Sequence, residues 1–363
     1  MPHDLDRRLR RDFPYRTGRV YLNSAGAGLP WVGAQRAAAA HFADIARRGA
    51  EARSGWLEVE ESARERVSRM LRLPHADIAF LHSTTEVMSL AAASMAWKAG
   101  DEVVFPADDF PTVVLAWQGA RAAGAHLVSV PIDDEARRTD LLLAAVTSRT
   151  RVVAVTHVNA TTGTRVDLDR LGAACRDVGA LLVVDGIEAL GSIPVDFGPV
   201  DVYGAGVFKW LLSGFGTAIG VFRERARAVL TPACRGYRNP PPSRRFEYSE
   251  PNFPGLAVLD ATLAYLEDVG WDTVHRRVKE LTAMVDASVR RHGLVIVTPP
   301  QRGGIVSFAH RDADAVVERL RADGVDVVSK GGLVRVSPHF YNTPDDISRF
   351  DAALGAALVE TSG

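Results

Sequence analysis

Seven short apolar runs, separated by segments with helical patterns, follow one another between residues 78 and 222 of the chain. The runs are IAFLH (78–82), EVVFP (102–106), HLVSV (126–130), RVVAVTHV (151–158), ALLVVDG (180–186), DVYGAG (201–206) and AIGVF (218–222). Several are apolar at consecutive positions, which is typical of parallel strands covered on both faces. Between two of them, Asp167 and Gly179 are start and stop signals for a helix. Repeated strand–helix units predict a doubly wound α/β domain.

The last third of the chain has a different pattern. A helical pattern covers about 256–291, and short apolar runs with two further helices follow it. This combination predicts a small α+β domain. With 363 residues the chain is long enough for two domains. We expect a large domain over residues 16–262 and a small domain formed by residues 1–15 and 263–363.

Composition argues against several classes of function. A net charge of −1 provides no basic surface for nucleic acid. The opening MPHDLDRRLRRDF lacks the apolar core of a signal peptide, and no apolar stretch is long enough to span a bilayer. Cys175 and Cys234 match no metal-ligand spacing, and so few cysteines are typical of cytosolic proteins. We therefore expect a cytoplasmic protein that binds no metal, nucleic acid or membrane.

Lys209 lies in the middle of a glycine-rich apolar stretch, YGAGVFKWLLSGFGTAIG (203–220). A lysine is rarely fully buried unless it is paired or has a function. The chain has only three other lysines, Lys98, Lys279 and Lys330, so few could act as a nucleophile. A lysine amine can form a Schiff base with a carbonyl cofactor, which makes Lys209 the candidate for that role.

Four other residues follow predicted strands, where ligands of open α/β sheets bind. Asp185 ends one strand, Thr84 and Thr85 lie at a strand-to-helix junction, and Phe110 lies at another. Taken singly, Asp185 could be a turn residue or a helix cap, Thr84 and Thr85 could be helix caps, and Phe110 could be a core residue. With Lys209, however, they supply what pyridoxal phosphate (PLP) requires: a lysine, an acid for the pyridinium nitrogen, a phosphate cradle and an aromatic wall. We therefore predict PLP as the cofactor.

The sequence resembles the class V aminotransferase group of fold-type I PLP enzymes, which includes cysteine desulfurases, kynureninases and isopenicillin N epimerases. The resemblance extends through nearly the whole chain and is carried by YLNSAGAGLP (21–30), HSTTEVMSLAA (82–92), DDFPTVV (108–114), THVNATTGTRVDL (156–168), VVDGIEALGSIPVD (183–196), FKWLLSGFGT (208–217), RRFEYSEPNFPGL (244–256) and VRVSPHFYNTPDDI (334–347). It implies the fold-type I PLP-dependent transferase fold and a homodimer with a shared active site. The segment 244–256 matches the one that reaches the neighbouring subunit's cofactor.

The resemblance also implies roles for individual residues. Lys209 would hold PLP and shuttle the Cα proton, and Asp185 would pair with the ring nitrogen. Arg335 would bind the substrate carboxylate, a task suited to a bidentate guanidinium. Ser24 and Asn159, in two of the matching motifs, are further expected substrate-binding residues.

The chain departs from the desulfurase pattern around the cofactor. Gly206 and Phe208 replace the serine and histidine of the usual Ser-x-His before the lysine. Glu188 stands where relatives carry a glutamine near the ring O3′, and we include it among the cofactor-binding residues. Ala160 replaces an asparagine, and Glu250 aligns with the threonine that a partner subunit gives to the phosphate. The phosphate cradle therefore lacks several of the usual contacts.

The desulfurase nucleophile is also missing from its expected place. The approach to Arg335, DGVDVVSKGGLVRVSP (323–338), is short and contains no cysteine. Persulfide chemistry requires a thiolate near the substrate sulfur. We therefore exclude cysteine desulfurase.

The residues and the resemblance predict an enzyme that acts on an α-amino acid through a Lys209 Schiff base and Cα deprotonation. A β-eliminating C–S lyase comes first, and a class V aminotransferase or an amino-acid epimerase are the alternatives. Two hypotheses of other classes are a non-catalytic PLP-fold binding protein and a nucleotide-binding α/β protein. Retention of Lys209, Asp185 and Arg335 disfavours the first, and the lack of a G-x-G-x-x-G or Walker lysine motif disfavours the second.

Overall fold

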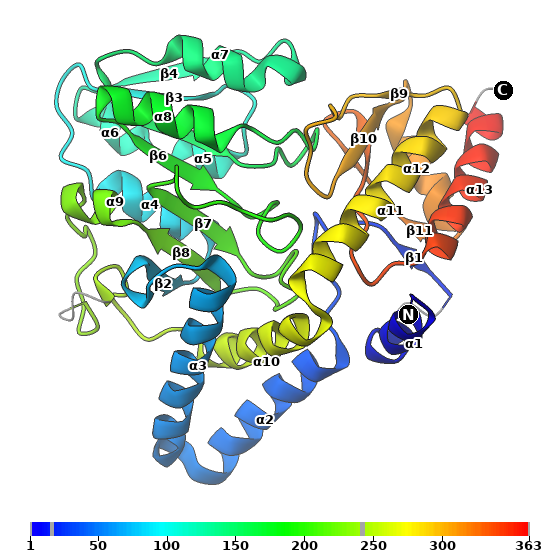
Figure 1. Ribbon diagram of the computed structural model, residues 1–363, viewed down its shortest axis with the longest axis horizontal. Coiled ribbons are helices and arrows are strands. Elements are labelled where there is room, and N and C mark those ends of the chain that lie inside the picture. The colour runs from blue at the N-terminus through cyan, green and yellow to red at the C-terminus, as the bar shows by residue number, and fades with distance from the viewer. Residues whose placement is uncertain (1, 15–17, 240–243, 362–363) are drawn as a thin grey trace.

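A computed structural model describes residues 2–14, 18–239 and 244–361. A large sheet with flanking helices forms one side of the molecule, and a small sheet with helices α12 and α13 forms the other (Figure 1). Helix α11 (Trp271–Arg291) runs from the first part to the second.

The large sheet has seven strands in the order β2-β8-β7-β6-β5-β3-β4. Their bounds are β2 (Ile78–Leu81), β3 (Glu102–Pro106), β4 (His126–Val130), β5 (Thr150–Thr156), β6 (Leu181–Asp185), β7 (Val202–Gly206) and β8 (Ala218–Phe222). All pairings are parallel except those of β8, which runs antiparallel to both its neighbours. Each of the seven predicted runs is a strand, so the predicted doubly wound α/β domain is confirmed.

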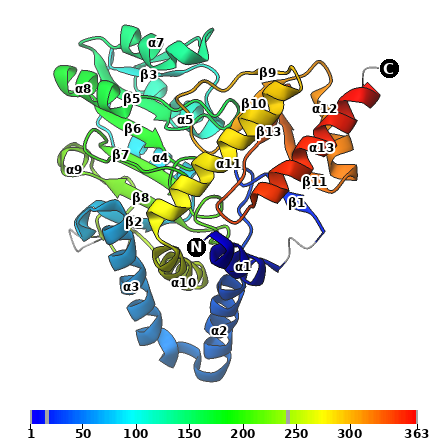
Figure 2. The ribbon, with the colours of Figure 1, turned by 45° about the vertical axis from the view of Figure 1, so that its right-hand side comes forward.

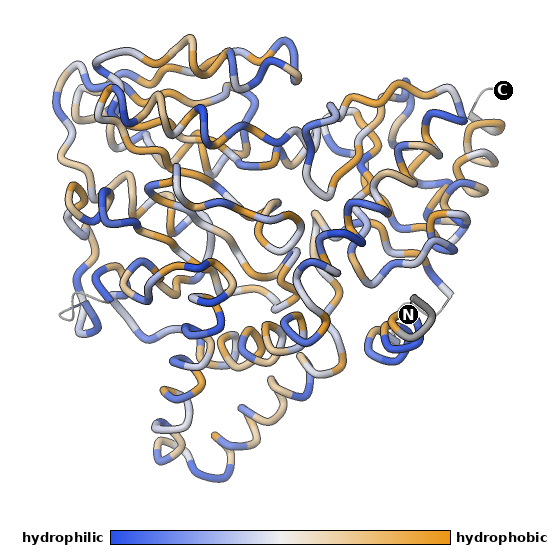
Figure 3. Tube along the Cα trace, in the orientation of Figure 1, coloured by the Kyte–Doolittle hydropathy of each residue, from blue (hydrophilic) through white to orange (hydrophobic). Residues whose placement is uncertain are grey.

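The central strands are apolar at consecutive positions because both faces of the sheet are covered. In β6, Leu181 and Val183 pack into one core, whereas Leu182 and Val184 pack into the other. The first core is completed by α4 (Thr84–Ala93), α5 (Pro111–Leu115), α6 (Gln118–Ala122) and α9 (Glu224–Val229), and the second by α3 (Arg53–Leu71), α7 (Arg138–Ala145), α8 (Leu168–Val178) and α10 (Phe253–Val269). Hydrophobic residues accordingly follow the strands of this sheet in Figure 3.

Helix α8 has the expected start and stop signals. The Asp167 side chain accepts a hydrogen bond from Arg170 N at 3.1 Å, which satisfies an N–H of the first turn. Gly179 ends the helix in the left-handed conformation, with a φ of 74°. The next strand, β6, then delivers Asp185 to the carboxyl edge of the sheet.

The small sheet is antiparallel, in the order β12-β13-β10-β9. Its strands are β9 (Val295–Ile296), β10 (Val306–Ala309), β12 (Val328–Lys330) and β13 (Leu333–Val336), and α11, α12 (Ala313–Ala322) and α13 (Pro344–Thr361) pack around it. The N-terminal segment also lies here: β1 (Val20–Tyr21) pairs with β11 (Val325–Asp326), and Asp6 of α1 (Pro2–Asp12) forms an ion pair with Arg277 (Figure 2). The helices α2 (Val32–Arg48) and α3 project away from both sheets (Figure 1).

The long helix expected over 256–291 is in fact two helices. Helix α10 ends at Val269, and α11 begins at Trp271. Gly270, between them, has a φ of 88°, a value that glycine adopts without strain. The predicted domain boundary at 262 falls inside α10, and the one at residues 15 and 16 lies outside the described residues.

None of the described helices combines the length and the apolar character that crossing a bilayer demands.

Candidate active site

A cavity of about 140 Å³ opens at the carboxyl ends of β5, β6 and β7. It is lined by Ser83, Thr84, Thr85, Phe110, Thr112, Thr156, Ala160, Asp185, Ile187, Glu188, Phe208 and Lys209. All six residues predicted to contact the cofactor are in this set, although they come from four separate segments of the chain. The location is the one expected for a ligand site in an open α/β sheet.

Lys209 is buried and paired. Its Nζ donates to Glu188 Oε1 at 2.7 Å, and Trp210 Nε1 donates to Glu188 Oε2 at 3.0 Å. Lys209 is 8% exposed and Glu188 is fully buried. A buried ammonium is tolerated only when its charge is compensated, so Glu188 is the group that allows Lys209 to face this cavity as a cation.

The segment that carries Lys209 is held closely by its surroundings. Gly28 N donates to Phe208 O at 2.9 Å, and a Cβ on Gly28 would lie 2.0 Å from Lys209 O. A Cβ on Gly304, which directly precedes the β10 region, would lie 2.4 Å from the Trp210 ring. Only glycine allows these approaches, which hold the backbone at Lys209 and the ring of Trp210.

Asp185 lies at the end of β6 and is 1% exposed. Its Oδ1 accepts a hydrogen bond from Ile187 N at 3.0 Å. Burial raises the pKa of Asp185 to about 7, while the Ile187 N–H and the charge of Lys209 act in the opposite direction. A cation placed in the cavity against this carboxyl group would compensate it, as the protonated ring nitrogen of PLP does.

Three hydroxyl groups meet at the start of α4. Ser83 caps the helix by accepting from Glu86 N at 3.1 Å, and Thr84 Oγ1 accepts from Gly206 N at 2.9 Å. Thr85 Oγ1 lies 2.8 Å from Thr112 Oγ1. Together with the positive end of the helix dipole, these hydroxyls form a surface suited to an anion. They fit the phosphate of PLP.

Phe110 is 42% exposed and forms part of the cavity wall, so it is not a core residue. Phe208, in place of the desulfurase histidine, stacks on Phe215 with ring centroids 4.2 Å apart. The cavity therefore has apolar rings on two sides. Glu250 lies elsewhere and binds Arg53 and Arg238.

Arg335 is buried behind the rim of the cavity, with 3% of it exposed. Its Nη1 donates to Ala160 O at 2.7 Å, and its Nη2 donates to Asn23 Oδ1 at 3.0 Å. Nε is buried without a partner, and no carboxylate among the described residues pairs with this guanidinium. Burial accordingly lowers the pKa of Arg335. A buried cation with a free donor fits a site for an external carboxylate.

The structure does not place Ser24 or Asn159 on the wall of this cavity. Ser24 Oγ lies 2.8 Å from Tyr341 OH. Asn159 Oδ1 accepts from the backbone N–H groups of Thr161 and Thr162, which shapes the loop after β5. The substrate-binding roles expected for these two residues stay predictions.

Several residues at the site were not anticipated from the sequence. Thr112 and Thr156 line the cavity, and buried Asp109 accepts from Thr156 N at 2.9 Å and Phe110 N at 2.8 Å. Asp109 thereby joins the ends of β3 and β5. The position of Asp109 shortly after the predicted strand at 102–106 could have indicated a site residue, but the sequence DDF (108–110) is equally typical of a turn.

Neither cysteine lines the cavity. Cys175 is buried in α8, and burial raises the pKa of its thiol to about 12. Cys234 is partly buried and packs against the core on the α4 side of the sheet. That neither cysteine takes part in the reaction stays a prediction.

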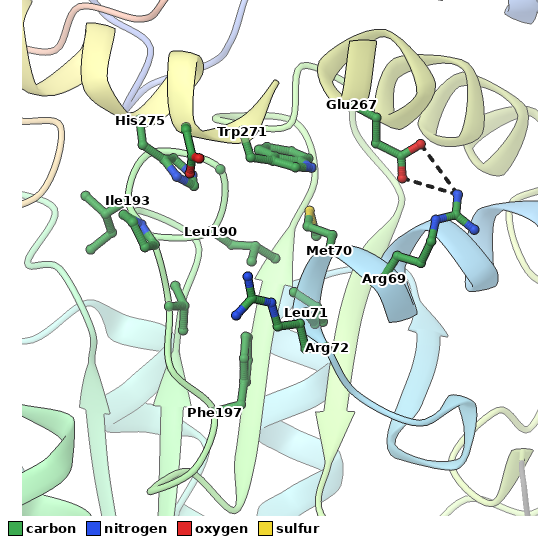
Figure 4. Close-up of a pocket in the computed structure, with 14 residues that line it drawn as sticks. Arg69, Met70, Leu71, Arg72, Leu190, Ile193, Phe197, Glu267, Trp271 and His275 are labelled. Atoms are coloured by element: carbon green, nitrogen blue, oxygen red, sulfur yellow. Dashed lines mark hydrogen bonds and ion pairs between the residues drawn. The ribbon is translucent and has the colours of Figure 1, made fainter. Parts of the chain in front are cut away.

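A larger cavity, of about 480 Å³, lies on another part of the molecule between the end of α3, residues 190–197 and the start of α11 (Figure 4). Its wall contains the ion pair between Arg69 and Glu267, at 3.3 Å. It contains none of the residues predicted to bind cofactor or substrate, so size alone does not mark the candidate site.

The fold and the cavity with its paired lysine, buried acid and hydroxyl-lined helix start define a PLP-dependent enzyme of fold type I. The chain belongs to the class V aminotransferase family, whose model, described as "Aminotransferase class-V", matches residues 35–350. It is 28% identical to a probable cysteine desulfurase of Methanothermobacter thermautotrophicus, over 98% of both chains. It is 29% identical to the isopenicillin N epimerase of Amycolatopsis lactamdurans, over 82% of this chain and 83% of the relative.

Solved structures show the same fold. C-DES, in a lysine-to-alanine variant with glycine covalently linked to the PLP cofactor, has a TM-score of 0.87 over 95% of this chain and 98% of C-DES, at 20% identity. The apo cysteine desulfurase of Thermococcus onnurineus NA1 has a TM-score of 0.86 over 96% and 97% of the two chains, at 21% identity. The predicted fold class, family and cofactor are confirmed.

Proposed function

We propose that the protein is a β-eliminating lyase that cleaves the C–S bond of an S-substituted α-amino acid. In the overall reaction the Cα–H, Cβ–S and Cα–N bonds break, and one water molecule supplies the keto oxygen. The products are pyruvate, ammonia and a thiol, and there is no net oxidation or reduction. PLP supplies the electron sink that stabilises negative charge at Cα.

Four residues would hold the cofactor. Lys209 is the residue for its covalent attachment, and Asp185 pairs with the ring nitrogen. Thr84 and Thr85 bind the phosphate. Asp185 suits its role because its burial makes a carboxylate costly unless a cation lies beside it.

Lys209 also moves the substrate's Cα proton. Glu188 orients the Nζ through the 2.7 Å contact, and Trp210 fixes Glu188 in turn. Arg335 binds the substrate carboxylate through the donor that its present neighbours leave free. A carboxylate fixed at Arg335 and a base at Lys209 together determine which substituent of Cα faces the base.

The observation that favours elimination over sulfur transfer to the enzyme is the surroundings of the cavity, which hold no thiol. The strands β12 and β13, where desulfurases carry the cysteine loop, are joined here by Gly331 and Gly332 alone. A sulfur leaving Cβ would then find no cysteine of this chain in the cavity lining and would depart with its own substituent. C-DES, which shares this fold with a TM-score of 0.86, is described as a cystine C–S lyase.

A cytoplasmic homodimer with a shared active site completes the proposal. Support comes from the segment 244–256, whose Glu250 lies away from its own chain's cavity, and from apolar side chains exposed on α2 and α3, such as Phe42 (59%) and Leu57 (39%). Sedimentation of the holoenzyme at assay concentration tests the dimer, and a fully active monomer would exclude it.

The reaction is tested with a panel of amino acids that includes S-alkyl cysteines. Pyruvate with ammonia, exchange with a keto acid, and loss of chirality are scored separately on the same holoenzyme preparation. Pyruvate and thiol in equal amounts support the proposal. Exchange or racemisation without pyruvate would instead identify an aminotransferase or an epimerase.

A further inference from the structure

Lys330 and Arg335 project from the same face of the small sheet. In the antiparallel pair β12–β13, Val328 lies opposite Arg335 and Lys330 lies opposite Leu333. Paired residues share a face, and so do residues two apart on one strand. Lys330 is therefore on the face of Arg335, at the end of the strand next to the turn.

This face points to the loop that borders the candidate active site. Arg335 binds Ala160 O, and Ala160 lines the cavity. Beside Lys330, a Cβ on Gly331 would lie only 3.0 Å from Thr161 Cγ2, so the turn touches the same loop. Lys330 Nζ lies 5.3 Å from the centroid of the Phe110 ring, which is part of the cavity wall.

The turn holds Lys330 in this position. Gly331 and Gly332 have φ values of 58° and 76°, and left-handed values at both central residues are those of a tight two-residue hairpin turn. Lys330 is the last residue of β12 and is hydrogen-bonded in register with Leu333. The ammonium group is thus carried by a short, well-defined hairpin.

The charge of Lys330 is not compensated within the chain. Among the described residues, no carboxylate lies within ion-pair distance of the Nζ of this half-buried lysine, whereas the buried Lys209 has Glu188. Burial and the charges of Arg335 and Lys209 lower the pKa of Lys330, whereas the charge of Glu188 raises it. The charge of Glu188 also acts on Arg335, but its two carboxylate oxygens are engaged by Lys209 and Trp210. Within the part of the chain that the structure describes, neither Arg335 nor Lys330 therefore has a carboxylate of its own.

One α-carboxylate can compensate only one of these two cations. Asp185, at the end of β6, would be matched by the cofactor's ring nitrogen. The remaining positive charge lies above Phe110, on the side of the cavity that faces the small sheet. A substrate with a second anion on its side chain would compensate it through a charge-assisted hydrogen bond.

We propose that Lys330 is a specificity-determining residue that selects amino acids whose side chain ends in a carboxylate. For a C–S lyase, the corresponding substrates are cysteine S-conjugates with an acidic S-substituent. This inference rests on the proposed function in taking the cavity as the substrate site, but the selectivity applies to whichever reaction occurs there.

The test compares each acid with its uncharged amide of nearly the same shape. Adipate and adipamate, which lack an amino group and do not react, are titrated into the holoenzyme by calorimetry. S-carboxymethylcysteine and S-carbamoylmethylcysteine are compared by kcat/KM for pyruvate formation. We expect each acid to be favoured about tenfold or more over its amide, as charge-assisted hydrogen bonds typically allow.

Three variants separate a charge effect at Lys330 from other causes. Lys330→Met should bring both ratios close to one, mainly through KM. Lys330→Arg should keep the preference, and Lys279→Met, at an exposed position on α11, should leave both ratios as in wild type. A preference that survives in Lys330→Met, or that is absent from wild type, would overturn the proposal.

The remaining outcomes are also decisive. If neither cysteine conjugate yields pyruvate but adipate is preferred through Lys330, the selectivity stands and the proposed reaction fails. If pyruvate forms equally well from both conjugates, the reaction stands and the selectivity fails. If Lys330→Met loses PLP while its ratios are unchanged, Lys330 binds the cofactor phosphate and not the substrate.

Discussion

Replacing Asp185 with asparagine is expected to stabilise the apoprotein at neutral and alkaline pH while it impairs the enzyme. Asparagine has the same shape and can still accept the hydrogen bond from Ile187 N. It removes the charge that burial disfavours. The holoenzyme, in contrast, loses the partner of the cofactor's ring nitrogen and should show a much lower kcat.

The size and sign of the effect follow from the pKa of Asp185, which burial raises from 3.8 to about 7. Below pH 3.8 the folded and unfolded chains are both protonated, and burial of the charge costs nothing. Between about pH 4 and pH 7 the unfolded chain ionises while the folded chain keeps its proton, so stability falls as the pH rises. The difference amounts to roughly 4 kcal/mol by pH 8, at about 1.4 kcal/mol per pH unit.

The measurement is urea unfolding of PLP-free protein, followed by circular dichroism at several pH values from 5 to 8. The free energy of unfolding of Asp185→Asn should exceed that of wild type by a margin that grows with pH and levels off above about pH 7. Asp133→Asn, at an exposed loop position, serves as the matched control and should show no such trend. A margin that stays constant from pH 5 to 8 would refute the reasoning.

Three further substitutions test the assigned residues. Lys209→Ala should abolish the visible absorption of the bound cofactor and all turnover while the protein stays folded; a borohydride-stable adduct on another lysine would contradict the assignment. Glu188→Gln should destabilise the apoprotein by about 3–5 kcal/mol, because it leaves a buried ammonium unpaired. The control Glu280→Gln, in an exposed pair with Arg276, should cost less than about 1 kcal/mol. Equal losses of stability would show that the Lys209–Glu188 pair is not formed. Arg335→Leu should raise KM for amino acids roughly 30-fold or more, since loss of a buried charged partner costs about 2–5 kcal/mol; an unchanged KM would remove Arg335 from the substrate site.

The strands were predictable because burial on both faces leaves a direct mark on the sequence. Leu181 to Val184 are all apolar, and the residue that follows them, Asp185, was placed correctly at the edge of the sheet. The same logic located Thr84 and Phe110, whose strands, β2 and β3, end at the same edge of the sheet as that of Asp185. Strand ends of a parallel sheet converge, so a site can be assembled from residues that are far apart in the chain.

What the sequence did not reveal depends on distances between side chains. The contact of Glu188 with Lys209 requires the turn after β6 to fold back over the lysine loop, and no local pattern specifies this. Likewise, Lys330 reads as an ordinary turn residue until the register of β12 and β13 places it on the face of Arg335. The break at Gly270 was missed because the apolar spacing continues through it, although a glycine in a helical pattern is a known stop signal.

The antiparallel strand β8 has a consequence for the way the chain is made. Among the described strands, β2 (Ile78–Leu81) has β8 (Ala218–Phe222) as its one neighbour, and α3 packs on α10, which begins only at Phe253. At about 5–20 residues per second, a ribosome takes roughly 7–28 s to pass from the first of these strands to the second. During that time the apolar strand β2 has been synthesised but lacks its partner, so its apolar residues are exposed to aggregation. A chain truncated shortly before residue 218 would keep β2 in that state permanently, with an unpaired edge open to aggregation.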